Sequence, residues 1–110
     1  MKVLHALDLV PMGAPDVTLI EAVAAGAVGK AVLITADKAM RTRQHERAAF
    51  EATGCIGIVL RKQWSHASLY DRARLSLLWW TTWVELARVA SPGTLWQSPW
   101  AERPKPLKPF

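Results

Sequence analysis

The sequence has 110 residues, which is enough for one hydrophobic core and too few for two, so we expect a single domain. Its hydrophobic fraction of 51% and charged fraction of 21% are ordinary for a globular protein, and the formal net charge of +5 favours acidic partners such as nucleic acid. No apolar run reaches the length of about 18 residues that a transmembrane helix needs. Aspartates and prolines break the N-terminal apolar stretch, which excludes a signal peptide. We therefore expect a cytoplasmic protein without a membrane segment.

Strand-like and helix-like segments alternate in the first half of the chain. Short apolar, β-branched runs bounded by turn residues predict strands, and apolar positions that recur every three or four residues predict helices. Asp16 precedes the first helix and is placed to cap it. The order β-α-β-α-β favours right-handed crossovers and a parallel sheet. These five segments cover residues 2–7, 17–27, 31–35, 43–53 and 55–60.

A longer helix is expected over residues 68–90, where Pro92 and Gly93 stop it. One stripe of this helix is expected to be apolar and a second set of residues to widen it. The stripe is Leu69, Leu77, Trp80, Val84 and Ala87, and the widening set is Leu78, Trp79, Trp83 and Leu86. The proline-rich segment that follows shows no periodicity and is expected to be irregular. The predicted organisation is therefore a domain over residues 1–93 and a Pro/Trp-rich tail over residues 94–110.

Two acids lie at the junctions between predicted strands and the helices that follow them. Asp37 follows the strand at residues 31–35, and Asp16 opens the first helix. Ligands of open α/β sheets gather beyond the carboxyl ends of the strands, so these carboxylates would lie on one edge. Two carboxylates there would suit Mg²⁺ or Mn²⁺, which activates water and stabilises a phosphodiester transition state. Spacing alone leaves another interpretation open, in which Asp16 is only a helix cap and Asp37 only a turn residue.

The same residues resemble PIN domains, the family of the VapC-type toxin ribonucleases. The segment Ile34-Thr35-Ala36-Asp37-Lys38 is similar to a late acidic motif of the family, and residues 15–20 resemble the preceding helix with its N-terminal acid. The basic run after Asp37, the apolar strand at residues 54–60 and the tryptophan-bearing helix follow in the same order, so that the resemblance spans residues 3–93. It implies a three-layer PIN-like α/β fold with a short parallel sheet flanked by helices, and Asp16 and Asp37 as metal-associated catalytic acids.

The resemblance also has a gap. PIN domains begin with a strand that bears an Asp, and no such strand precedes Lys2, since Asp8 comes too late. We therefore expect an N-terminally incomplete fold with two of the usual four acids, which weakens divalent ion binding because affinity depends on ligand charge and number. Glu21 is expected to be a solvated helix residue.

Four cations follow Asp37 closely and are candidate RNA phosphate contacts: Lys38, Arg41, Arg43 and Arg47. The alternative is an ordinary solvated helix start. His45 is expected to be exposed, and His66 to lie in a loop before the long helix. Cys55, the only cysteine, is expected to be a buried strand residue rather than a nucleophile.

Two functions remain open at this point. The first is a metal-dependent ribonuclease of toxin-antitoxin type, with RNA as substrate and an antitoxin protein as partner. The second is a truncated, inactive PIN-like remnant that binds RNA or protein. Trp79, Trp80 and Trp83 are expected to surround their helix, so that one side meets a partner, as a dimer or antitoxin surface rather than an RNA-stacking platform.

Overall fold

A four-stranded sheet lies at the centre of the computed structural model, which describes residues 3, 9, 15–27, 29–36 and 43–110. The strands are β1 (Val32–Thr35), β2 (Ile56–Leu60), β3 (Leu95–Ser98) and β4 (Lys108–Pro109), and they are arranged in the order β1-β2-β3-β4. β1, β2 and β3 are parallel, whereas β4 runs antiparallel to β3. The expected mixed α/β fold with a mostly parallel sheet is therefore confirmed.

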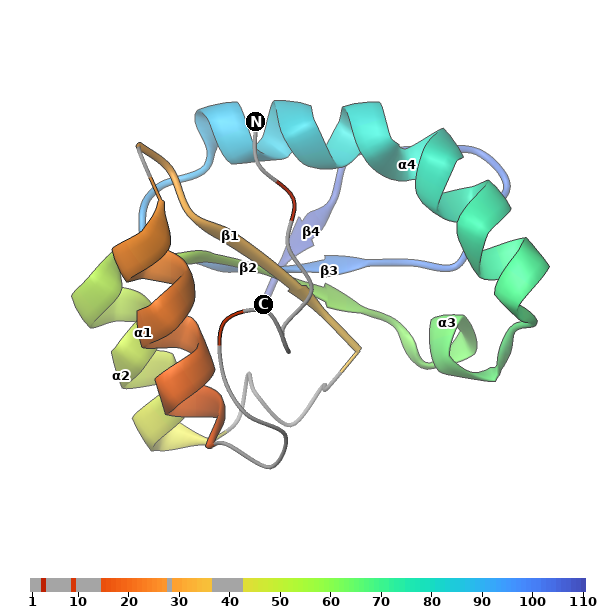
Figure 1. Cartoon of the computed structure of the whole chain (residues 1–110). Helices are drawn as coiled ribbons and strands as arrows, with labels where there is room; N and C mark the ends of the chain where they lie inside the picture. The colour runs from red at the N-terminus through yellow and green to blue at the C-terminus, as the bar shows by residue number, and fades with distance from the viewer. Residues whose placement is uncertain (1–2, 4–8, 10–14, 28, 37–42) are drawn as a thin grey trace.

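Helices α1 (Asp16–Gly26) and α2 (Gln44–Thr53) lie side by side against one face of the sheet (Figure 1). Ile20 of α1 and Phe50 of α2 are fully buried there, against Leu33 and Val59 of the strands. Gly57 lets α2 pack close to β2, because a Cβ atom at this position would lie 3.0 Å from a ring carbon of Phe50. A glycine in β2 thus lets the aromatic ring rest directly on the strand.

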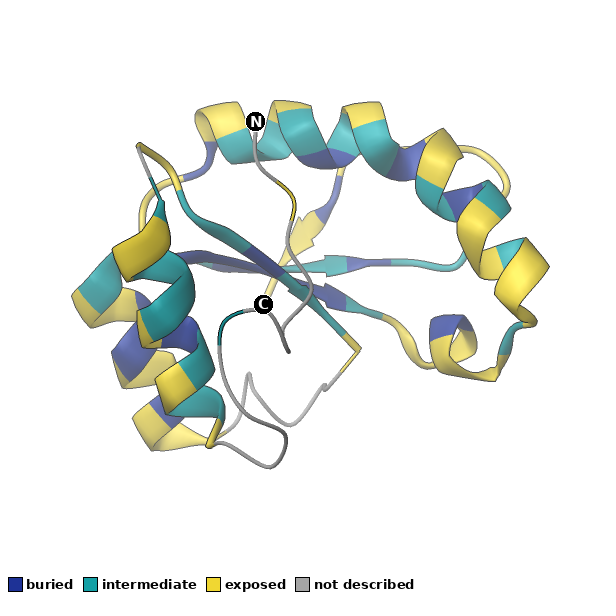
Figure 2. Cartoon of the chain, viewed as in Figure 1, coloured by how far each residue is buried: buried dark blue, intermediate teal, exposed yellow. Residues whose placement is uncertain are grey.

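Helix α4 (Leu69–Val89) covers the other face, and the short helix α3 (Lys62–His66) lies beyond the end of β2 (Figure 1). Trp79 and Trp83 of α4 pack with Ile58 of β2 and with Trp64 of α3. Neighbouring residues of a strand point to opposite faces of the sheet. Val59 therefore belongs to the core cluster under α1 and α2, and Ile58 to the cluster under α4. Figure 2 shows the resulting buried positions of the strands between the two helical layers.

Indole N–H groups attach the C-terminal segment to the helices. Trp79 Nε1 donates to the carbonyl oxygen of Ala101 at 2.9 Å, and Trp64 Nε1 donates to that of Pro99 at 3.1 Å. Trp83 Nε1 donates at 2.9 Å to Ser98 Oγ, and Ser98 is itself fully buried. These bonds satisfy polar groups that would otherwise be buried without partners. They fix the segment after β3 in one conformation.

Several predicted elements agree closely with the structure. The expected strands at residues 31–35 and 55–60 are β1 and β2, and the expected helices at 17–27, 43–53 and 68–90 are α1, α2 and α4. Ser68 caps α4 by accepting a hydrogen bond from Asp71 N, and Gly54 ends α2 in the left-handed conformation. The strand expected at residues 2–7 lies outside the described residues, apart from Val3.

Other expectations about the second half of the chain are wrong. The tail is not irregular throughout, since residues 95–98 form β3 and pair with β2, so the sheet crosses the boundary expected at Gly93. Trp79, Trp80 and Trp83 do not surround α4, because all three pack into the same cluster. Leu69 and Leu77 of the expected apolar stripe are 78% and 79% exposed.

None of the helices that the structure describes is long and apolar enough to cross a membrane.

Candidate functional site

Helices α1 and α2 both begin on the side of the sheet where β1 ends (Figure 1). Asp16 is the first residue of α1, Arg43 is the residue before α2, and Glu46 lies in the first turn of α2. Arg43 joins the two helices, because its Nη2 donates to Asp16 Oδ2 at 3.1 Å while its Nε lies 2.8 Å from Glu46 Oε2. Two acids and one arginine therefore meet at this edge of the sheet.

Glu46 is the least expected member of this group, since it is a charged residue that is only 2% exposed. Its Oε2 atom is buried and makes no hydrogen bond, although it lies in ion-pair range of Arg43. Burial raises the pKa of Glu46 above its ordinary value, and the Arg43 guanidinium only partly offsets this. The charge of Asp16 and a hydrogen bond with its side chain raise the pKa of Glu46 further. The folded chain therefore disfavours the ionised form of Glu46.

Asp16 does not cap its helix, so the capping interpretation is wrong. Pro15 occupies the cap position and makes no side-chain capping bond. The Asp16 side chain instead extends to Arg43 and keeps 29% of its surface exposed. Glu46 is therefore the buried carboxylate of the pair, and Asp16 is the carboxylate that solvent can reach.

The other predicted site residues are distributed unevenly. Asp37, Lys38 and Arg41 lie outside the described residues, and so the meeting of Asp16 with Asp37 stays a prediction. Arg43 lies beside the acids, whereas Arg47 is exposed on α2, one residue beyond the buried Glu46. The role of these cations as phosphate contacts stays a prediction.

Glu46 is not a site residue in the sequence-based prediction, yet the sequence contains a signal for it. The buried residues of α2 are Glu46, Ala49 and Phe50, which fall three and four residues apart on one helical face. A carboxylate on the core-facing side of an amphipathic helix is rarely fully buried unless it is paired. The helical periodicity of α2 is therefore sufficient to indicate that Glu46 faces inward.

The donor set can be compared with the needs of a divalent cation. Asp16 and Glu46 supply carboxylate oxygens, the ligand type that Mg²⁺ and Mn²⁺ prefer, and the orphaned Glu46 Oε2 fits such a group in kind. Within the described ranges, however, no cluster of three or more His, Cys, Asp or Glu side chains is suited to hold a metal ion. The described residues thus provide part of a carboxylate site, which Asp37 would have to extend.

Four further expectations about single residues have an outcome. Cys55 is fully buried, and burial raises its pKa to about 11, which confirms a core residue rather than a nucleophile. His45 is exposed, as expected, and so is Glu21. His66 is not in a loop but ends the short helix α3.

Helices on both faces of a mostly parallel sheet, with acids at the edge where β1 ends, define an α/β domain with a polar site outside its strands. Comparison with known families refines this class. The family model described as "PIN like domain" matches residues 1–62, which is more than half of the chain, and the chain belongs to this family. No curated protein and no solved structure gives a significant match.

Proposed function

We propose that this chain is a metal-dependent ribonuclease that hydrolyses RNA phosphodiesters, of the VapC-related toxin-antitoxin type. Membership of the PIN-like family supports a nuclease. The single observation that carries the proposal furthest is the buried Glu46 carboxylate, which faces Asp16 at the start of two neighbouring helices. Perturbed carboxylates gather at functional sites because proton transfer and metal binding need shifted pKa values.

In this proposal, Asp16, Glu46 and Asp37 hold Mg²⁺ or Mn²⁺. The cation would supply activation of the attacking water and stabilisation of charge on the phosphodiester. Arg43 holds the carboxylates of Asp16 and Glu46 close together, since it contacts both. Burial of Glu46 excludes water from one side of the site and keeps that carboxylate in a fixed position.

The RNA backbone would be bound by the cations next to the acids. Arg43 carries a guanidinium at the acid pair itself, so a phosphate bound there would lie beside the proposed metal. Lys38 and Arg41 are proposed as further contacts, and the exposed Arg47 as a contact one residue beyond Glu46.

The proposal is tested by metal titration and by cleavage with matched variants. We expect the wild-type chain to bind Mn²⁺ in a calorimeter and to cleave RNA with it, and we expect Glu46→Gln and Asp37→Asn to weaken both. Glu21→Gln removes an exposed acid from α1 and should behave as wild type. Equal cleavage by wild type, Glu46→Gln and Asp37→Asn would contradict the proposal.

A second function is favoured by the small number of acids in the described part of the chain. Two carboxylates that already share the Arg43 guanidinium suit a PIN-like module that binds RNA or protein without catalysis. In that case Mn²⁺ titration gives no heat, whereas RNA still binds. An antitoxin or a second copy of the chain would then find exposed apolar side chains on α4, namely Leu69, Tyr70, Leu77 and Leu78.

A further inference from the structure

A shallow hollow of about 510 Å³ lies between α3, the start of α4 and the segment that follows β3. Lys62, Gln63 and His66 line it from α3, and Trp100 lines it from the C-terminal segment. α3 follows β2 closely and Trp100 follows β3 closely, so the hollow lies beyond the carboxyl ends of these two strands. This is the edge of a parallel sheet at which ligands bind.

Trp100 is held rigidly on its inner side. Its ring meets that of Trp64 at an interplanar angle of 90° with 4.8 Å between the ring centroids. Trp64 is only 1% exposed, and its Nε1 bonds to the carbonyl oxygen of Pro99, next to Trp100 in sequence. Trp100 itself is half-buried, which leaves part of its ring toward the hollow. A fixed aromatic ring can stack a ligand at a low cost in conformational entropy.

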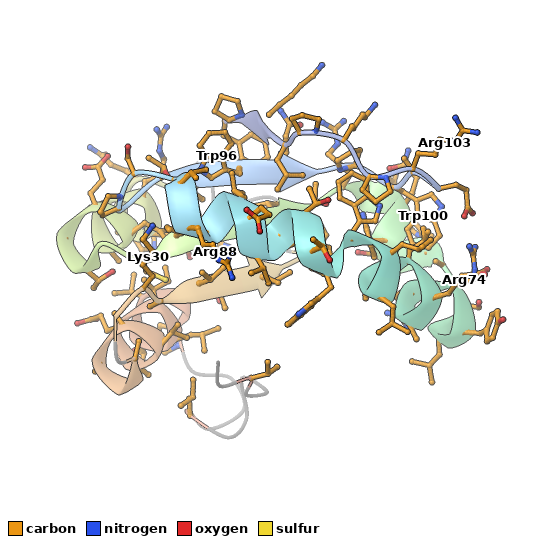
Figure 3. The ribbon with its side chains drawn as sticks, turned by 90° about the horizontal axis from the view of Figure 1, so that it is seen from above. Lys30, Arg74, Arg88, Trp96, Trp100 and Arg103 are labelled. Carbon is orange, nitrogen blue, oxygen red and sulfur yellow. The ribbon has the colours of Figure 1, made fainter. Side chains whose placement is uncertain are left out.

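Cations outnumber acids around this ring, although Arg74 is paired with Glu102 as well as with Asp71. Lys62 and the adjacent Arg61 are exposed, and Arg61 Nη1 donates to Gln97 Oε1, which holds it across the ends of β2 and β3. Among the described residues that line the hollow, the one acid is Asp71, and it contacts Arg74 at 3.4 Å. Trp100, Arg103 and Arg74 lie at the same end of the molecule, whereas Lys30 and Arg88 lie toward the other end (Figure 3).

We propose that this hollow binds an unpaired base of single-stranded RNA, stacked on Trp100, with the adjoining phosphate at Lys62. The inference rests on the proposed ribonuclease function and adds a binding subsite to it. The ends of β1 and β3 are two strand spacings apart, or about 10 Å. In this proposal, an RNA strand whose base occupies the hollow runs past Arg61 at the end of β2 toward the acids beyond β1.

The test measures binding of an end-labelled single-stranded RNA to the full chain by fluorescence anisotropy in EDTA, which prevents cleavage. Trp100→Ala should weaken binding roughly 5- to 150-fold, the effect of losing one base–aromatic stack. Lys62→Ala should reduce the slope of log K against log salt concentration by about 0.7, the value for one phosphate contact to a single strand. A duplex of the same sequence should bind Trp100→Ala and wild type equally, since its bases are already stacked.

Matched controls come from the same chain. Trp96→Ala removes a partly buried tryptophan that lies away from Trp100, and Lys30→Ala removes an exposed lysine near the other end of the molecule (Figure 3). Both should bind RNA as wild type does. If Trp100→Ala lowers the circular dichroism signal of the folded chain, Lys62→Ala decides instead, and Trp100→Phe, which keeps an aromatic ring, should retain most of the affinity.

The outcomes separate the two proposals. If the wild-type chain cleaves RNA with Mn²⁺ while Lys62→Ala and Trp100→Ala bind RNA as tightly as wild type, the hollow is not a subsite and the ribonuclease function stands. If the wild-type chain neither binds nor cleaves RNA, both proposals are wrong. If binding depends on Trp100 but no cleavage occurs with metal, the subsite stands and the catalytic function does not.

Discussion

Glu46→Gln should stabilise the chain against unfolding at neutral pH when no metal is present. The folded-state pKa of Glu46 lies above its unfolded value, chiefly through burial, so the folded state disfavours the ionised carboxylate. The cost is absent below the unfolded pKa of Glu46, grows as the pH rises toward the folded pKa and is complete above it. A neutral amide of the same shape avoids that cost. The expected gain is at most about 1 kcal/mol, because the amide also gives up the ion pair of Glu46 Oε2 with Arg43 Nε.

Urea unfolding in EDTA measures this gain directly, and the melting temperature should rise by roughly 4 °C per kcal/mol for a chain of this size. The advantage of Glu46→Gln over wild type should shrink between pH 7 and pH 4. Glu51→Gln changes an exposed glutamate of the same helix and should show no such pH dependence. A Glu46→Gln chain that is less stable than wild type in EDTA at pH 7 would refute the reasoning.

Added Mn²⁺ should reverse the order of stability. A ligand that binds only the folded state stabilises it by RT ln(1 + [L]/Kd), so wild type gains from the metal and Glu46→Gln gains less. Such a carboxylate lowers the stability of the metal-free chain and raises that of the metal-bound chain. This behaviour is typical of a functional residue.

Three further predictions concern the core. Gly57→Ala should destabilise the chain by about 1 to 3 kcal/mol in urea unfolding, because overpacking strains a filled core and the new methyl would lie 3.0 Å from the Phe50 ring. Trp83→Phe should cost about 1 to 3 kcal/mol in the same assay, since the buried Ser98 hydroxyl loses its 2.9 Å indole donor. Cys55 should react with a thiol reagent only in urea, because it is fully buried and its pKa is raised to about 11; rapid labelling of the native chain at pH 8 would contradict this.

The elements around the parallel sheet can be predicted from the sequence because their local signals agree. β2 is an uninterrupted apolar run, α2 ends at Gly54 in the left-handed conformation, and Ser68 supplies a cap for α4. β3 cannot be predicted in this way. It is a short strand followed at once by Pro99, and its position depends on pairing with β2 and on the indole bonds of Trp64 and Trp83. Such distant partners leave no periodic pattern in the sequence.

The candidate site is predictable only in part for a similar reason. Asp16 is recognisable because it stands at the start of a helix, but its partner Arg43 is 27 residues away and suggests only a phosphate contact when the sequence is considered alone. Glu46 resembles an ordinary member of a charged run, although its spacing to Ala49 and Phe50 puts it on the core side of α2. Residue type and periodicity disagree at this position, and periodicity is the better guide.

The strands after position 93 have a practical consequence for protein production. The family match ends at residue 62, whereas the sheet takes β3 and β4 from the C-terminal segment. An expression fragment cut at the end of the match would leave the apolar strand β2 as an open edge, with its Ile58 face uncovered, and such edges pair with other copies and precipitate. A purification tag fused directly to Phe110 would lie next to the sheet, because Phe110 N bonds to Leu95 O.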